Sequence, residues 1–527
     1  MEYQNPIVYA DFSDPDVIRV NDNYYMIASS FTNTPGLPIL KSQDLVNWKL
    51  VNYAVSNVPD ESYFESVRHG CGIWAPAIRF HEGTYYILFP MPDEGIYMVK
   101  TSDPEGQWSE PVCICKYSGY IDPCPFFDDD GRVYMVFGVA KSRIGFKSVL
   151  FMCELNKDLT GLISEPVKVF DGNFNGQETI EGPKLYKKNG YYYIFSPAGG
   201  VKQGWQTVLR SKNIYGPYEY KVVLKQGNSS INGPHQGAWV TTQAGEDWFV
   251  HFQDVYAAGR IICLEPMTFT GDGWPIIGRK VLGEDFGEAV EHFRYPKGLE
   301  DKEKYVLQAS DDFEGVKLGL QWQFNGNHTA SFYECDSENK CLYLNSIRKE
   351  DSVSNQPNLL LQKWTKKEFE VRSFVDFSKL KDGDEAGIIN MGCTYGAVSV
   401  RLSNGIYSLV SVYGEQTFDK ENALGEDLVK VLLPDLCKEG FESLIEFRLK
   451  VTSLPSKEYN TDGEYKFPIP LERLDIDYRF KDTGEFVNGL SFTPAAGRWV
   501  GAKFGFYICN SLSDDGGKLT LKSVSVK

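Results

Sequence analysis

The sequence predicts an all-β protein in which a five-bladed β-propeller is followed by a β-sandwich. Three features predict this class: an aromatic strand that recurs five times, a proline-marked strand start before each recurrence, and short alternating strands in the second half. The chain of 527 residues is too long for one ordinary hydrophobic core, so two domains are expected. We expect a propeller over residues 1–300 and a sandwich over residues 301–527.

The recurring aromatic run reads YYMIAS, YYILFP, VYMVFG, YYIFSP and WFVHFQ. Each run follows a turn rich in Gly, Asn or Asp, and a strand precedes the turn, so each unit is a β-hairpin. The second positions of the runs are 61, 48, 59 and 56 residues apart, at Tyr25, Tyr86, Tyr134, Tyr193 and Phe249. Repeats of this length are typical of propeller blades, whereas the rival architectures, a β-sandwich or a β-helix, would repeat at shorter and more even intervals.

A proline-marked strand start lies at a nearly constant distance before each hairpin, in the motifs DPDVI, WAPAI, DPCPF, EGPKL and GPHQG. Proline is tolerated there because the first residue of a strand need not donate to the ladder. The innermost strand of each propeller blade begins at the mouth of the central channel, so equivalent positions form a ring. The predicted ring consists of Asp14, Trp74, Asp122, Glu181 and His235, which lie 11 to 14 residues before the repeated aromatic position.

The blade pattern stops near residue 295. The charged segment 295–306 (YPKGLEDKEKYV) is interpreted as a linker. Alternating runs such as FEVRSFVDF, YGAVSVRL and KLTLKSVSV then predict the antiparallel strands of a sandwich. No catalytic constellation is evident in this half.

The composition excludes several classes of partner. A formal charge of −17 without a long basic run disfavours nucleic acid and anionic lipid, but has no bearing on neutral sugars. No apolar run is long enough to be inserted in a membrane. Eleven cysteines without metal-type spacing predict buried free thiols. The first residues lack a signal-peptide pattern, and because a trimmed signal would look the same, periplasm and cytoplasm both stay open.

Three carboxylates in the predicted ring suggest glycosidic bond hydrolysis. That reaction needs one carboxylic acid to protonate the leaving oxygen and one carboxylate to activate water or to attack. Asp14 and Glu181 fit these roles, on blades that are not adjacent, and a channel between them suits the roughly 6.5–9.5 Å separation of inverting enzymes. A charged Asp122 near Glu181 would raise the pKa of that glutamate. Asp14 and Glu181 taken singly could be ordinary turn residues, but their common phase in the repeat favours a site.

Four further residues are candidates for the same site, each with a plain structural alternative. Trp74 offers a flat face for a sugar ring or fills the core, and Phe31 is a weaker candidate for lining the pocket. His235 holds a cation such as Ca²⁺ in the channel, or is a hydrogen-bonded core histidine. Arg260, in AAGRIICLEPM, grips sugar hydroxyls or makes a surface salt bridge.

The motifs NPIVYADFSDPDVIRV, GIWAPAIR, DPCPFF, EGPKLYKKNGYYYIF and GPHQGAWV together resemble glycoside hydrolase family 43 over about 300 residues. The resemblance implies a five-bladed propeller with Asp14 as general base, Glu181 as general acid and Asp122 as the residue that orients the acid and tunes its pKa. It also implies a structural calcium ion in the channel beside His235. The second half, from about DDFEGVKLGLQWQFNGN, resembles the lectin-like, concanavalin-type sandwich of many exo-acting members.

This resemblance implies an exo-acting, inverting hydrolase whose Trp74 and Arg260 contact the sugar. The expected product is terminal α-L-arabinofuranose, with β-D-xylose close behind, from arabinose- or xylose-containing oligosaccharides of plant hemicellulose. A β-xylosidase as the main activity remains an alternative, as does a carbohydrate-binding propeller without catalysis, although all three carboxylates are present. The NDPNG-type and ECP motifs of the retaining fructan hydrolases, a confusable five-bladed group, do not occur.

Overall fold

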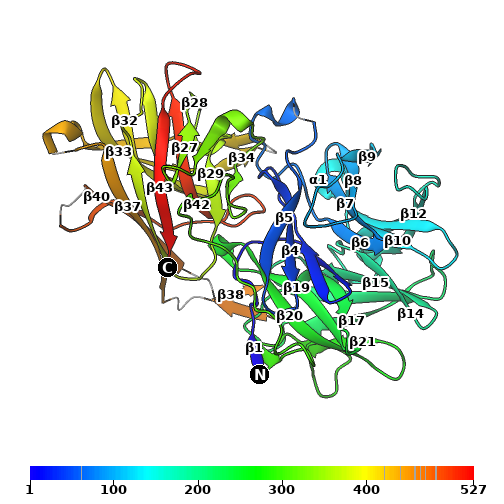
Figure 1. Ribbon diagram of the computed structural model, residues 1–527. Coiled ribbons are helices and arrows are strands. Elements are labelled where there is room, and N and C mark those ends of the chain that lie inside the picture. Colours follow the sequence, from blue (N-terminus) through cyan, green and yellow to red (C-terminus); the bar gives the residue numbers. More distant parts are fainter. Residues whose placement is uncertain are drawn as a thin grey trace.

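The computed structural model describes the whole chain except residues 61, 420–421, 440, 456–458, 463–464, 469–470 and 481–483. It confirms an all-β protein with a five-bladed propeller and a sandwich of two large sheets. The two parts lie side by side, the propeller running from blue to green and the sandwich from green to red (Figure 1). The last strand before the sandwich ends at Arg294, and the first strand of the sandwich begins at Gln323.

Five antiparallel sheets form the blades, and each contains four strands that are consecutive in sequence. Two short strands, β22 (Arg279–Lys280) and β23 (Gly287–Glu288), extend the fourth sheet. The blade strands are β2 (Asp16–Val20), β3 (Asn23–Ile27), β4 (Gly36–Ser42) and β5 (Lys49–Val55); β6 (Ala77–His81), β7 (Thr84–Met91), β8 (Gly95–Thr101) and β9 (Val112–Cys115); β10 (Tyr120–Phe127), β11 (Val133–Val139), β12 (Val149–Leu155) and β13 (Val167–Asp171); β14 (Lys184–Lys188), β15 (Tyr191–Ala198), β16 (Trp205–Ser211) and β17 (Glu219–Lys225); and β18 (His235–Thr241), β19 (Asp247–Asp254), β20 (Arg260–Phe269) and β21 (Pro275–Ile277).

The recurring aromatic run is the second strand of every blade, and its register repeats. Its second position always lies opposite a residue in the innermost strand that follows the proline-marked start. The five cross-strand pairs are Ile18 with Tyr25, Arg79 with Tyr86, Phe126 with Tyr134, Tyr186 with Tyr193, and Trp239 with Phe249. The spacing in the sequence therefore corresponds to a common register, which places the strand starts at the same end of every blade.

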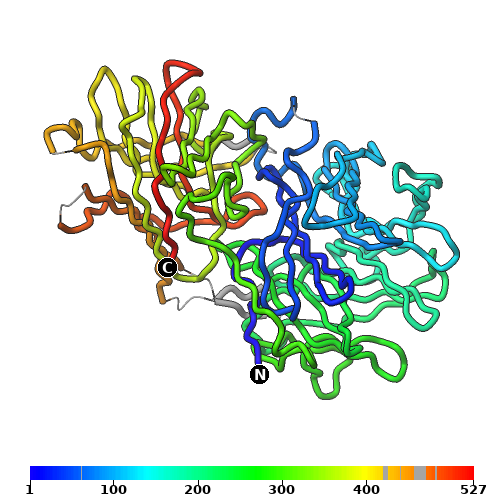
Figure 2. Tube along the Cα trace, viewed as in Figure 1, coloured from blue at the N-terminus to red at the C-terminus, as the bar shows by residue number. Residues whose placement is uncertain are grey.

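The N-terminal segment fastens the last part of the propeller to the first. Strand β1 (Glu2–Gln4) pairs with β24 (His292–Arg294), and Val8 bridges to Ile262 in the fifth blade. Figure 2 shows this blue N-terminal segment beside the green segments of the last blade. This closure joins the first and fifth blades and so completes the ring of strand starts.

Two sheets face each other in the sandwich around a core that includes Trp322, Trp364 and Phe506. The first sheet has the order β25 (Gln323–Phe324), β29 (Leu360–Lys363), β42 (Lys503–Asn510), β31 (Asp384–Met391), β32 (Thr394–Ser403), β33 (Ile406–Glu415) and β36 (Leu428–Leu433), with β28 (Ile347–Arg348) beside β42. The second has the order β26 (Tyr333–Asp336), β27 (Cys341–Asn345), β43 (Lys518–Val526), β30 (Phe369–Asp376), β37 (Leu444–Leu454), β40 (Leu471–Phe480) and β41 (Val487–Phe492).

The remaining elements are short. The described residues contain one α-helix, α1 (Lys141–Ile144), and no helix with the length and apolar character needed to span a bilayer. All eleven cysteines are free, as predicted, but only seven of them are buried, because Cys113, Cys335 and Cys393 are partly exposed and Cys437 is exposed. Two small hairpins and six single 3₁₀ turns complete the part of the chain that the structure describes: β34 (Thr417–Asp419) with β35 (Asn422–Leu424), β38 (Tyr459–Asp462) with β39 (Tyr465–Pro468), η1 (Tyr63–Glu65), η2 (Gly172–Phe174), η3 (Tyr256–Ala258), η4 (Ala330–Phe332), η5 (Val353–Asn355) and η6 (Leu436–Glu439).

The sandwich packs against the propeller beside the ring of strand starts. Thr34 of the first blade bridges to Phe324, and the backbone N–H of Ala502 donates to Ala257 O at 2.7 Å. The carboxylate of Asp11 accepts from the Gly501 N–H at 2.8 Å. The segment that precedes β42 therefore packs directly against the N-terminal segment around Asp11 and against the fifth blade.

Lys503, the first residue of β42, is buried at this interface with 3% of its surface exposed. Burial lowers the pKa of its ammonium group to about 7, Lys363 acts in the same direction, and Asp11 opposes the shift. The unfolded chain holds this proton up to a much higher pH, so this lysine destabilises the fold most fully below pH 7 and progressively less as the pH rises toward 10.

We therefore expect Lys503→Met to raise the melting temperature, and to raise it more at pH 6 than at pH 9.5, because methionine keeps much of the side-chain volume without the charge. Calorimetry at both pH values measures the difference. Lys450→Met, at an exposed position, serves as the control and should give no such pH-dependent gain. An equal gain at both pH values would assign the effect to packing alone.

Candidate active site

All seven residues that the sequence singled out line one cavity of about 360 Å³ at the mouth of the propeller channel. Asp14, Trp74 and Glu181 lie just before the innermost strands of their blades, and His235 is the first residue of β18. Asp122 lies inside β10, beside a register shift between Ile121 and Cys124. The seven are Asp14, Phe31, Trp74, Asp122, Glu181, His235 and Arg260.

Asp14 and Asp122 share an uncommon backbone conformation. Their φ angles are 58° and 57°, in the left-handed region that non-glycine residues rarely adopt. Both precede a proline and both turn the chain into an innermost strand, in the first and third blades. Such strained positions concentrate at functional sites, and here the turn points both carboxylates into the same cavity.

Asp14 is held by two donors. Its Oδ2 accepts a hydrogen bond from Ser29 Oγ at 2.5 Å, and its Oδ1 lies 3.3 Å from Arg260 Nη1. The side chain is 7% exposed, so one carboxylate edge still reaches the cavity. These two contacts fix the direction of the carboxylate and leave it facing the cavity, as a proton acceptor for water requires.

Glu181 is the most exposed of the three carboxylates, with 28% of its side-chain surface accessible. Its Oε1 lies 2.9 Å from His235 Nε2, whose ring is buried. Its backbone is fixed as well, because Ser196 Oγ donates to Glu181 O at 2.5 Å and the Glu181 N–H donates to Pro197 O at 3.1 Å. The carboxyl group is thus oriented at one oxygen and open to the cavity at the other.

Asp122 lies behind Glu181 and is almost fully buried. Its Oδ2 accepts from the Gly182 N–H at 2.7 Å. Burial raises the pKa of Asp122 to about 8; the charges of Glu181 and Asp14 act in the same direction, and Lys184 opposes them. From the sequence we expected Asp122 to raise the pKa of Glu181, and the structure adds a raised pKa for Asp122 itself. Because interacting carboxyl groups titrate together, the cluster keeps a proton near neutral pH.

Aromatic side chains form the walls of the cavity. The rings of Phe31 and Trp74 lie 6.2 Å apart, and Trp74 Nε1 donates to Gly70 O at 2.9 Å. Trp499, from the loop between β41 and β42 of the sandwich, lies 6.4 Å from Trp74 and 5.8 Å from the guanidinium of Arg260. Sequence reasoning missed Trp499, because no repeat or motif marks it and its place depends on how the two domains pack.

The calcium ion that the resemblance implies beside His235 stays a prediction. His235 Nδ1 is buried and lacks a hydrogen-bond partner, so it is one available donor. Calcium takes six to eight oxygen ligands, and the described residues contain no group of three or more His, Cys, Asp or Glu side chains that could hold a metal. The inner strands also carry two cations, the buried Lys184 and the half-buried Arg79. We assign no step of the chemistry to a metal.

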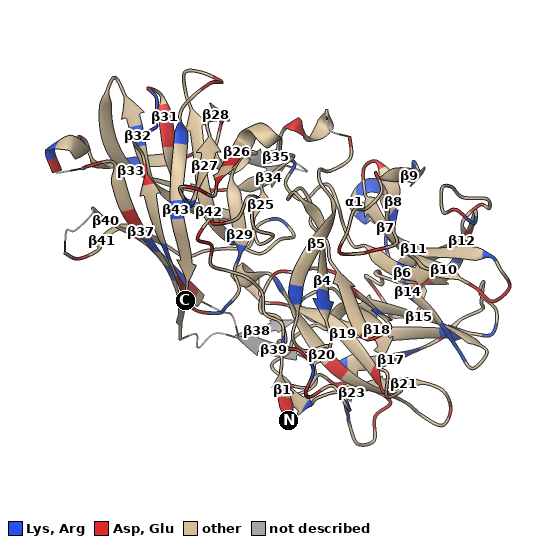
Figure 3. Ribbon diagram, in the orientation of Figure 1, with Lys and Arg blue, Asp and Glu red and all other residues tan. Residues whose placement is uncertain are grey.

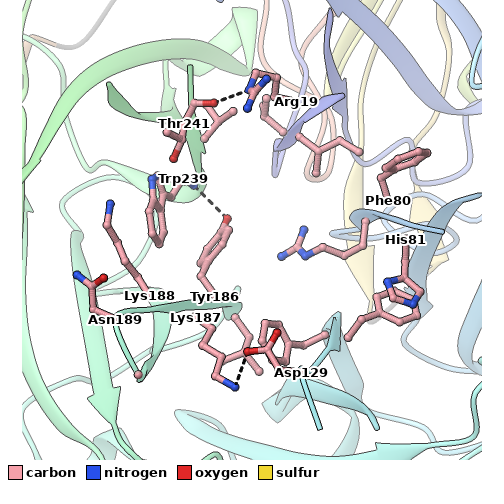
Figure 4. A pocket seen from close by; sticks show the side chains of 18 residues that line it. Arg19, Phe80, His81, Asp129, Tyr186, Lys187, Lys188, Asn189, Trp239 and Thr241 are labelled. Atoms are coloured by element: carbon pink, nitrogen blue, oxygen red, sulfur yellow. Dashed lines mark hydrogen bonds and ion pairs between the residues drawn. The ribbon is translucent and has the colours of Figure 1, made fainter. Parts of the chain in front are cut away.

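A larger cavity, about 740 Å³, opens at the other end of the channel (Figure 4). The ends of the innermost strands line it, with Phe80, His81, Tyr186 and Trp239 around it and Arg79 at its wall. None of the three carboxylates lines this cavity, so its size does not make it the catalytic site.

The channel mouth that gathers Asp14, Asp122 and Glu181 between aromatic walls defines a propeller-type glycoside hydrolase. The comparisons with known proteins agree with this class. The chain belongs to glycosyl hydrolase family 43, whose model matches residues 3–275. The model of the β-xylosidase C-terminal concanavalin A-like domain matches residues 310–527, so the lectin-like sandwich is confirmed as well.

Individual relatives resemble large parts of the chain. A putative β-xylosidase of Xylanibacter ruminicola is 37% identical over 361 residues, which cover 68% of this chain and 66% of that protein. A non-reducing end α-L-arabinofuranosidase of Bacteroides ovatus is 28% identical over 407 residues, 73% of each chain. The structure of a bifunctional GH43-CE protein of Bacteroides eggerthii aligns with a TM-score of 0.79 and 28% identity, covering 99% of this chain and 63% of that one.

We expect Asp122→Asn to move the basic limb of the kcat/KM profile to lower pH by about one unit or more. The wild-type cluster keeps a proton up to about pH 8 because burial of Asp122, and then the like charges of its neighbours, oppose loss of that proton. With a neutral amide in place of Asp122, that opposition disappears, and the general acid loses its proton at lower pH. Rates from pH 4 to 10 on a substrate with a poor leaving group measure the shift. An unmoved limb with activity intact would make Asp122 a structural residue.

Proposed function

We propose that this protein is an exo-acting, inverting glycosidase that removes one terminal pentose from the non-reducing end of an oligosaccharide. The observation that carries the proposal is one cavity that contains two carboxyl groups with different partners. Asp14 contacts Ser29 and Arg260, and Glu181 contacts His235. Asp14 takes the role of general base and Glu181 the role of general acid.

In the proposed reaction Asp14 removes a proton from water, and the water oxygen attacks the anomeric carbon as the glycosidic bond breaks. Glu181 gives its proton to the departing oxygen. Asp14 and Glu181 come from the first and fourth blades and lie on separate sides of the channel mouth. This placement supports the proposal that a water molecule fits between the two carboxyl groups. Attack from the face opposite the leaving group inverts the anomeric configuration.

Asp122 and His235 serve Glu181 in this proposal. Asp122 keeps a proton in the cluster near neutral pH, as its raised pKa indicates. His235 Nε2 contacts Glu181 Oε1 at 2.9 Å and directs the other carboxyl oxygen toward the substrate. Arg260, Trp74 and Phe31 would contact the sugar, because all three line the same cavity.

An exo mode of action is supported by the shape of the site. A cavity of about 360 Å³ accepts one or two sugar rings, and Trp499 of the sandwich stands beside Arg260 at its edge. A groove that threads a polymer would need an open path on both sides of the carboxylates.

Two pentosides are candidate substrates. The name of the Xylanibacter relative favours a β-D-xyloside, and the name of the Bacteroides ovatus relative favours an α-L-arabinofuranoside. We propose β-D-xyloside as the main substrate, which reverses the order that we expected from sequence, with arabinofuranoside second. Differences of this size in one pocket are commonly worth about 1–3 kcal/mol, so both activities in one protein are compatible.

The test is a rate comparison on nitrophenyl β-D-xyloside, nitrophenyl α-L-arabinofuranoside and xylobiose. Hydrolysis of at least one aryl pentoside and of xylobiose, with free pentose as the first product, is expected. No turnover of any pentoside would return the chain to the alternative of a carbohydrate-binding propeller.

A further inference from the structure

A second cavity of about 490 Å³ adjoins the catalytic cavity where the propeller meets the sandwich. The two share Val201, Arg260 and Trp499 in their walls, so they are contiguous. Val201 follows β15, the strand whose Pro197 O accepts from the Glu181 N–H. The second cavity therefore lies between the fourth blade, which carries the proposed general acid, the fifth blade and the sandwich.

Aromatic faces and cations alternate around this second cavity. Lys202 Nζ lies 5.3 Å from the ring centroid of Tyr256, and Arg498 Cζ lies 4.9 Å from that of Phe418. Trp499 completes the wall and is 46% exposed. Exposed aromatic faces are common surfaces for sugar rings, since the ring and the apolar face of a sugar bury each other. The two cations favour a negatively charged group on the ligand, whereas the aromatic faces alone would suffice for a neutral sugar.

Lys202 and Arg498 form no ion pair within the described part of the chain, although acidic residues outnumber basic ones by 71 to 54. Among the described residues, Asp254 is the only carboxylate in the wall of the second cavity. Burial raises the pKa of Asp254, with Arg260 and Lys202 opposing the shift. One carboxylate therefore stands in this wall against the three cations Lys202, Arg260 and Arg498. Elsewhere basic residues are spread among acidic ones (Figure 3), and α1 adds Lys141 to the rim of the catalytic cavity.

We propose that the second cavity receives the leaving-group part of the substrate, and that Lys202 and Arg498 select a leaving group that carries a uronic acid branch. The proposal rests on the proposed function, because it takes the terminal pentose to lie between Asp14 and Glu181. A carboxylate accepts two parallel hydrogen bonds from a guanidinium group, and a lysine adds a point charge, so this pair suits a single sugar carboxylate. Such a substrate is a xylo-oligosaccharide with a glucuronosyl branch next to its terminal xylose.

A matched pair of substrates isolates the carboxylate. The first is a xylo-oligosaccharide with a glucuronosyl branch on the penultimate xylose, and the second is the same compound with that carboxyl group reduced to an alcohol. The readout is the ratio of kcat/KM for the acidic compound to kcat/KM for the reduced one. We expect the wild-type ratio to be roughly three to ten at low salt and to fall toward one at high salt, because exposed charge pairs contribute modestly and are screened.

The double variant Lys202→Gln/Arg498→Gln should bring the ratio close to one at low salt. Lys280→Gln is the control, since Lys280 is exposed on β22 and lines neither cavity. A wild-type ratio of one or less, or a ratio that the double variant leaves unchanged, overturns the proposal. Failure of the proposed function itself is distinguishable, because then neither xylobiose nor the reduced compound would be cleaved.

Discussion

Asp14→Asn is expected to lower kcat about 10³-fold or more while the protein still binds sugar, because the amide cannot take a proton from water. The fold should persist, since asparagine keeps the size of the side chain and can still accept from Ser29 Oγ. Steady-state rates on xylobiose and on an aryl xyloside measure the loss of kcat, and calorimetry with the product sugar measures the retained binding.

Azide supplies a further check on the role of Asp14. A small anion that needs no deprotonation should restore part of the turnover in the variant, with a glycosyl azide as product. Asp22→Asn, in an exposed turn of the same blade, is the matched control and should keep a near wild-type rate. An Asp14→Asn protein that keeps more than a tenth of the wild-type rate would show that the base lies elsewhere.

Glu181→Gln is expected to separate substrates by their leaving groups. An alkoxide leaving group, as in xylobiose, needs protonation, so kcat/KM should fall about 10²- to 10⁴-fold. A dinitrophenolate leaves without a proton, so the loss on that substrate should be far smaller. A series of aryl xylosides with leaving groups of different pKa gives the slope, which should be steeper in the variant than in the wild type.

The contact between Glu181 and His235 makes a further comparison useful. Glutamine can keep a hydrogen bond to His235 Nε2, so the variant should preserve the geometry of the acid position while it lacks the proton. Equal losses on xylobiose and on the dinitrophenyl xyloside would remove Glu181 from the acid role and point to a positional one.

The repeat in the sequence was sufficient to predict the propeller and to bring the predicted residues together. Asp14, Trp74, Glu181 and His235 share a phase with the repeated aromatic position, and that phase became a common register in the blades. Phase is a local property of each hairpin, so it can be read without knowledge of tertiary contacts. Asp122 was found by the same rule even though it lies within β10. The strand begins earlier here, before the register shift between Ile121 and Cys124, while Asp122 keeps its distance in sequence from the repeated aromatic position.

Other parts of the site depend on contacts that no local pattern records. Trp499, Arg498 and Phe418 come from sandwich segments far along the chain, and their place beside Arg260 follows from the packing of the two domains. The upward pKa shift of Asp122 depends on burial behind Glu181, which the sequence could only suggest as a neighbouring charge. The calcium prediction rested on the resemblance and on one histidine, and it stays a prediction.

Proton NMR of the first sugar released from xylobiose or an aryl xyloside tests the central claim most directly. Two carboxylates that hold a water molecule between them should invert the anomeric centre, so a β-xyloside should give α-xylose first, and a single pentose should precede any longer product. The signal of the α anomer should then decay to the mutarotation equilibrium. β-Xylose as the first product, or early oligosaccharides from a polymer, would contradict the roles proposed for Asp14 and Glu181.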